Sequence, residues 1–290
     1  MQHQTVGEIG FVAPIQTLRA AAMMHTDLAY VLLSGGRSSD ALTQTNHASR
    51  LVDSMLNDRA DEAARTFGIR WYAFTTSMFT AHGMFDAAQR LVRAGLIALP
   101  RAAELYVARG SIQEMRNNVD VDDELSHGIA RDGRPSIRVT RMMELAATDF
   151  QRALDLDATM ALAHLHRGWA HLQLRDGRAS ADLEAALAAA TDDDVRYLAH
   201  LFLGAVAEQH GDLDRARGEF ESAKALGGHQ TAYVALARTE AALGHTDRAR
   251  ELAADYTRLA RKTDDPWWDY RLGGFNAAAL RWLRVEARHR

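Results

Sequence analysis

The amino-acid sequence predicts an all-α solenoid built from antiparallel helix pairs. The main observation is a block of small, large and small residues, spaced by four and then three positions, which lie together on one face of a helix. The block returns after 33, 37 and 33 residues, and its first small residues are Ala146, Ala179, Ala216 and Ala249. Its large residues in the first three copies are Phe150, Leu183 and Phe220. A period of about 34 residues is typical of helix-turn-helix arrays.

The prolines support the same division of the chain, since none of the four interrupts a periodic stretch. Pro14 precedes the first expected helix, Pro100 separates two helices, and Pro266 opens the terminal segment. Pro135 lies in residues 117–138, which are rich in Asn, Asp, Gly and Arg. We interpret residues 117–138 as a loop inserted within one repeat.

The chain as a whole, residues 1–290, is predicted to be a single solenoid. Residues 1–13 are expected to form a tail, and residues 14–116 the N-terminal repeats. Ala41 and Ala88 hold equivalent places there at a separation of 47 residues, which exceeds a standard repeat by about 13 residues. We therefore expect longer helices, or a longer connection between them, near residues 51–64.

The C-terminal repeats are expected in residues 139–262, and the clearest unit is residues 197–228. Gly204 would let its two helices approach closely, and Gly211 would end the first helix in the left-handed conformation. The positions that define the pattern hold Leu203, Gly204, Gly211, Ala216, Phe220 and Ala223. This pattern resembles the tetratricopeptide repeat family. The resemblance implies a right-handed superhelix of about six helix pairs, with a concave groove lined by the first helix of each pair.

Residues 263–290 depart from the repeat and are expected to form a C-terminal cap. Asp264, Asp265 and Pro266 form a helix-start signal, because acids and Pro favour the first helical turn. A solenoid needs an atypical end to cover its last apolar face. The residues expected to cover it are Trp267 or Trp268, Phe275, Leu280 and Leu283. Binding of a partner by these residues is the alternative.

Composition and motifs exclude several functional classes. The chain has no cysteine, which excludes disulfides, thiolate metal sites and Cys nucleophiles. The net charge of −4 gives no overall attraction to nucleic acid. No apolar run reaches the ~18 residues of a membrane span. The sequence contains no nucleophile elbow (Gly-x-Ser-x-Gly), no phosphate-binding loop, no dinucleotide-binding Gly-x-Gly-x-x-Gly and no His-Glu-x-x-His motif. We therefore expect no enzymatic activity and no cofactor. The start of the chain lacks a signal-peptide pattern, which predicts a cytoplasmic protein, or a periplasmic one if a leader was removed.

The resemblance implies that peptides bind in the groove of first-helix residues. Charged clamp residues that would hold an acidic chain terminus are missing from the central repeats, so a largely apolar groove that accepts a peptide or helix is expected. Its residues are Leu162, Leu165, Trp169, Leu172, Leu198, Leu201, Ala205, Glu208, Val234 and Arg238. The predicted function is a non-catalytic protein-interaction scaffold. Trp169 has an alternative role, packing against the inserted loop or the chain's own N-terminus.

Histidines suggest a second function. His164 and His200 hold equivalent places in successive first helices, and His164 and His171 are seven residues apart, on one helical face. Imidazoles in such an arrangement could hold a transition metal. A small-molecule or metal-linked sensor is therefore the alternative function, although packing is the expected role of these histidines. Self-association is a further possibility, since a second copy could cover an incomplete N-terminal end.

Overall fold

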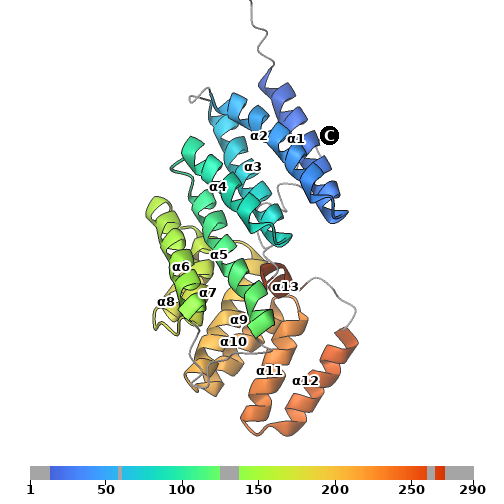
Figure 1. Ribbon diagram of the computed structural model, residues 1–290. Coiled ribbons are helices and arrows are strands. Elements are labelled where there is room, and N and C mark those ends of the chain that lie inside the picture. Colours follow the sequence, from blue (N-terminus) through green and yellow to red (C-terminus); the bar gives the residue numbers. More distant parts are fainter. Residues whose placement is uncertain (1–13, 58–60, 125–136, 260–264, 272–290) are drawn as a thin grey trace, which may run out of the picture. The chain divides into compact units, whose positions relative to one another are not determined.

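The structure is a computed structural model that describes residues 14–57, 61–124, 137–259 and 265–271 (Figure 1). These residues form helices joined by turns, with no strand among them. Six helix pairs and one short helix follow one another as α1 Ile15–Ser34, α2 Ser38–Leu56, α3 Glu62–Ala81, α4 Phe85–Ala98, α5 Ala103–Glu124, α6 Ile137–Leu156, α7 Ala161–Gln173, α8 Ala179–Ala189, α9 Asp193–Gln209, α10 Leu213–Ala225, α11 Gln230–Ala242, α12 Thr246–Leu259 and α13 Pro266–Arg271. The predicted all-α fold of about six pairs is confirmed over this part of the chain.

The helices pack mainly against their neighbours in sequence, as in a solenoid. Contacts divide the chain into two compact units, with the boundary within α3, between Trp71 and Tyr72. A single solenoid stays a prediction. Unit 1 is the part up to Trp71, and unit 2 is the part from Tyr72 onward.

Unit 1 consists of α1, α2 and the first half of α3. Ala22 and Ala29 of α1 and Ala41 and Ala48 of α2 are fully buried, which lets the two helices approach closely. The indole Nε1 of Trp71 donates a hydrogen bond of 2.8 Å to the buried hydroxyl of Thr26. The helices α1, α2 and α3 contain 20, 19 and 20 residues, so the long interval in the sequence reflects long helices.

In three successive helix pairs of unit 2, the same packing contact joins the two helices of the pair. A glycine of the first helix faces a large buried side chain of the second, at Gly110–Phe150, Gly168–Leu183 and Gly204–Phe220. A Cβ atom added to these glycines would lie 2.4, 2.7 and 2.3 Å from the facing side chain. The periodic large residues of the sequence are therefore the residues that fill the space between paired helices.

The turn between paired helices also repeats. Gly211 and Gly244 have φ values of 76° and 86°, in the left-handed region that glycine adopts without strain. In the shorter turn between α7 and α8, Arg175 takes this conformation, with a φ of 54°.

The predicted bounds of the loop, residues 117–138, are wrong at both ends. The backbone of α5 remains helical to Glu124, and α6 begins at Ile137. Asn and Asp are poor helix formers, but extending an existing helix costs far less than nucleating a new one. Residues 125–136 lie outside the described part, as do the tail of residues 1–13 and the cap residues Phe275, Leu280 and Leu283.

Candidate functional site

Helix α13 lies against the first helices of three repeats in unit 2. Figure 1 shows this short helix beside α5 and α9 rather than in line with α11 and α12. Side chains of α5, α7 and α9 contact it, and we call them the α13-binding face. They are Glu114, His166, Trp169, Tyr197 and Phe202.

The centre of the α13-binding face is aromatic. The rings of Trp169 and Phe202 lie 4.5 Å apart by their centroids. Trp267 of α13 meets them edge-on at 5.3 and 5.7 Å, and Tyr270 meets Phe202 edge-on at 5.2 Å. Edge-to-face pairs at these separations are the favoured aromatic geometry. The four rings therefore form one apolar contact between α13 and the repeats.

A buried polar cluster lies at the Tyr270 end of this contact. The Tyr270 hydroxyl donates to Glu114 Oε1 at 3.2 Å, and His166 Nδ1 lies 2.7 Å from Glu114 Oε2. Glu114, His166 and Tyr270 are each at most 4% exposed. Burial, and then the charge of Glu114, raise the pKa of Tyr270 well above its usual value. Glu114 is thus a buried acid whose partners include a residue of α13.

A second acid, Asp265, fixes the start of α13. Asp265 is 3% exposed and accepts a hydrogen bond from the Trp267 amide at 3.0 Å, which caps the helix. Asp265 also accepts the Tyr197 hydroxyl at 2.9 Å and the Thr231 amide at 2.8 Å. Burial and the Asp265 charge raise the pKa of Tyr197. The start of α13 at Pro266 agrees with the signal in the sequence, and its acid also anchors the helix to α9 and α11.

The predicted groove residues are in different environments. The leucines Leu165, Leu172, Leu198 and Leu201 are at most 6% exposed and belong to the core of unit 2. Leu162, Trp169, Ala205 and Glu208 are partly buried. Val234 is 49% exposed, and the exposed Arg238 is ion-paired with Glu208. The leucines are therefore packing residues, because the first helices α7 and α9 contact one another.

Trp169 packs against α13, not only against its neighbours in the array. The sequence offered the inserted loop or the N-terminus as its intramolecular partner, whereas the structure places the C-terminal helix there. Trp267 or Trp268 was expected to cover the last repeat. Trp267 lies on the central repeats instead, and Trp268 is 47% exposed. The sequence signal that could have indicated this docking is the aromatic pair Trp267 and Tyr270, directly after a capped helix start.

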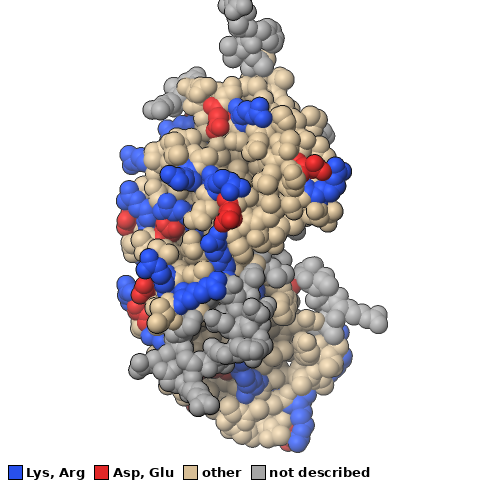
Figure 2. Space-filling model, viewed as in Figure 1, with Lys and Arg blue, Asp and Glu red and all other residues tan. Residues whose placement is uncertain are grey.

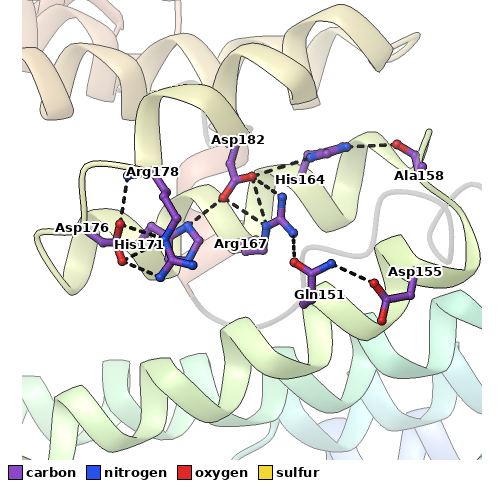
Figure 3. Close-up of polar contacts among 9 residues, drawn as sticks. All are labelled: Gln151, Asp155, Ala158, His164, Arg167, His171, Asp176, Arg178 and Asp182. Atoms are coloured by element: carbon purple, nitrogen blue, oxygen red, sulfur yellow. Dashed lines mark hydrogen bonds and ion pairs between the residues drawn. The ribbon is translucent and has the colours of Figure 1, made fainter.

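The histidine cluster is centred on Asp182 of α8. Figure 3 shows Asp182 between Arg167 and His171, with Gln151 and Asp155 beyond Arg167. His171 Nδ1 lies 2.7 Å from Asp182 Oδ2, and Arg167 Nε donates to both carboxylate oxygens at 3.1 Å. Burial raises the pKa of Asp182, but the hydrogen bonds from His171 and Arg167 outweigh it, so the net shift is downward.

The three histidines do not converge on one site in the described residues, and a metal held by them stays an untested prediction. His164 Nδ1 is 3.9 Å from Asp182, whereas His200 Nδ1 lies 2.8 Å from Glu219. No group of three or more His, Asp or Glu side chains within the described ranges is arranged to hold a metal. Arg109 pairs with Asp149 in the preceding repeat as Arg167 pairs with Asp182. These contacts therefore join the two helices of each repeat.

Charged side chains also lie elsewhere on unit 2. Figure 2 shows basic side chains gathered along the edge where α4, α5 and α6 lie, with acidic side chains among them. A cavity of about 400 Å³ lies in unit 2 at the start of α4. At this cavity, Arg116 pairs with Asp86 at 2.8 Å and lies over the ring of Phe85 at 5.4 Å. Arg90 also lines the cavity, so its charged side chains are two Arg and one Asp.

An apolar stripe on α1 is relevant to self-association. Met24, Leu28 and Val31 follow the spacing of one helical face and are 60%, 45% and 64% exposed. Self-association through this end of unit 1 stays a prediction. No helix in the described ranges combines the length and apolar character needed to cross a membrane.

Comparison with known proteins identifies the fold. No protein-family model and no curated protein matches the chain. Among solved structures, PilW, a type IV pilus biogenesis factor, is 20% identical, with coverage of 85% of this chain and 96% of PilW and a TM-score of 0.53. MamA is 22% identical, with coverage of 61% and 90% and a TM-score of 0.46. YrrB, a TPR protein, is 16% identical, with coverage of 68% and 89% and a TM-score of 0.43. The paired helices, their repeated glycine contact and the likeness to PilW show that this protein has a tetratricopeptide-type solenoid fold.

Proposed function

We propose that the protein is a non-catalytic interaction module that binds a short segment of a partner protein on the first helices of unit 2. The observation that carries this proposal is the α13-binding face itself. It holds a six-residue helix that lies outside the helix pairs. A surface that orders such a helix has the properties needed to bind a peptide.

The chemistry of the face supports this proposal. Trp169 and Phe202 provide a rigid aromatic centre, and Trp and Tyr residues are frequent anchors in protein interfaces. Glu114 contacts Tyr270 near the end of α13, and the Tyr197 hydroxyl contacts Asp265 just before its start. Apolar anchors give binding energy and polar contacts give orientation. A helical segment with matching anchors is the class of ligand that this face fits.

Site-specific photocrosslinking in the source cells would test this function without removing any buried side chain. A photoreactive amino acid replaces Val234 of the first helix α11, which is 49% exposed. The matched control is the same replacement at Leu145 of the second helix α6, which is 47% exposed. We expect a discrete protein adduct at Val234 and none at Leu145. Equal labelling at the two positions, or none at either, would contradict a partner on the first helices.

A further inference from the structure

Helix α13 differs from the other helices in what holds it in place. Six residues are too few for a stable helix in water, so α13 depends on its contacts with the repeats. Trp267 and Tyr270 face the repeats, whereas Trp268 between them is 47% exposed. This is the pattern of a short amphipathic helix bound in a groove.

Three side chains of this segment make the specific contacts. Asp265 accepts hydrogen bonds from Tyr197 and Thr231. Trp267 packs on the aromatic centre two positions later, and Tyr270 reaches Glu114 five positions after Asp265. An acid followed by aromatic residues at the second and fifth positions is thus the chemistry that the face recognises.

The α13-binding face contains buried polar groups. It places Glu114 and His166 at the contact with α13, where both are at most 4% exposed. His166 Nε2 is buried without a hydrogen-bond partner in the described part of the chain. An apolar contact at this place would stabilise a purely structural α13 at least as well, because buried polar groups cost free energy unless fully paired. The polar groups therefore make this contact less stabilising than an apolar contact of the same size would be.

We infer that residues 265–271 are a resident ligand of the α13-binding face, and that the partner presents a segment with the same acid–aromatic–aromatic spacing. The inference rests on the proposed function and names the chemistry of the partner segment. Because the resident helix is attached to the same chain, its effective concentration is on the order of 1 mM. A partner segment must displace it, so the docked helix weakens the apparent affinity by the ratio of docked to undocked molecules.

A binding assay with the full-length chain tests the inference. The probe is a fluorescent peptide with the sequence of residues 262–273, and its control carries Ala in place of the residues equivalent to Trp267 and Tyr270. The undocked protein is the double variant Trp267→Ala/Tyr270→Ala, which leaves every residue of the binding face in place. The matched protein control is Trp268→Ala, which removes an exposed indole from the same helix.

We expect the peptide to bind the undocked variant at least tenfold more tightly than it binds wild type or Trp268→Ala. The control peptide should bind none of them, and Trp169→Ala in the undocked background should remove binding. Circular dichroism checks that the undocked variant keeps its helices. If it does not, Asp265→Asn replaces it as a milder way to weaken docking.

Equal peptide affinity for wild type and undocked protein would overturn the inference, and so would no binding to a folded undocked variant. Failure of the peptide with persistence of the Val234 adduct would reject the inference and leave the proposed function standing. Loss of both would reject both. If wild type forms a dimer that the peptide dissociates, the occupant of the face is a second copy of this chain. That result would also overturn the inference, which assigns the segment to a different protein.

Discussion

The repeated glycine contact gives a quantitative test of the fold. Gly204→Ala would place a Cβ 2.3 Å from Phe220 Cε1, far inside van der Waals contact. Replacing Gly by Ala within a helix gains about 1 kcal/mol, whereas overpacking a core costs about 1–3 kcal/mol. Because Phe220 is 1% exposed and has little room to move, we expect Gly204→Ala to lower the free energy of unfolding by up to about 2 kcal/mol.

Gly218→Ala is the matched control, since Gly218 lies in α10 of the same repeat and a Cβ there meets nothing within 4 Å. This variant should be more stable than wild type by about 0.5–1 kcal/mol. Urea unfolding followed by circular dichroism gives both values, and an unchanged m-value would show that the midpoint reports stability. A Gly204→Ala protein as stable as Gly218→Ala would refute the packing argument.

Three further predictions concern the polar contacts. Asp182→Asn should lower the free energy of unfolding by about 3 kcal/mol, because it leaves the partly buried Arg167 without its carboxylate partner. Since the folded pKa of Asp182 is lowered, the stability difference between wild type and Asp182→Asn should shrink as pH falls below about 4. Urea titrations measure it, and a free energy of unfolding that changes with pH equally in both proteins would contradict the ion pair. Tyr270→Phe should weaken α13 docking by about 1–2 kcal/mol through the lost bond to Glu114. Because the folded pKa of Tyr270 is raised, wild type should lose stability as pH rises above about 10, and the variant should lose less; identical alkaline curves would contradict this. Zinc or nickel should leave the melting temperature of wild type unchanged, and a shift that His164→Ala removes would support the metal alternative.

The repeats could be predicted from the sequence because their pattern is local. Phe150, Leu183 and Phe220 each pack on a glycine within the same helix pair, so a periodic signal marks the contact. The helix start at Asp265 is local in the same way, because the acid and the capped amide are two residues apart.

The site could not be predicted, because its contacts join distant parts of the chain. Glu114 and Tyr270 are 156 residues apart, and His166 and Tyr270 are 104 residues apart. No period or motif relates them. The contacts of Asp182 with His171 and Arg167 were not predictable for a related reason, since they depend on the packing of α7 against α8.

The docking of α13 is the central feature of this account, and the amide of Thr231 reports it most directly. Thr231 is in the first turn of α11, where an amide has no partner within its own helix, and it donates to Asp265. Hydrogen exchange at this amide should accelerate in Trp267→Ala/Tyr270→Ala, together with amides of α13, and should not change in Trp268→Ala. Added peptide of residues 262–273 should restore protection at Thr231. Equal exchange at Thr231 in wild type and the double variant would contradict a docked, exchangeable α13.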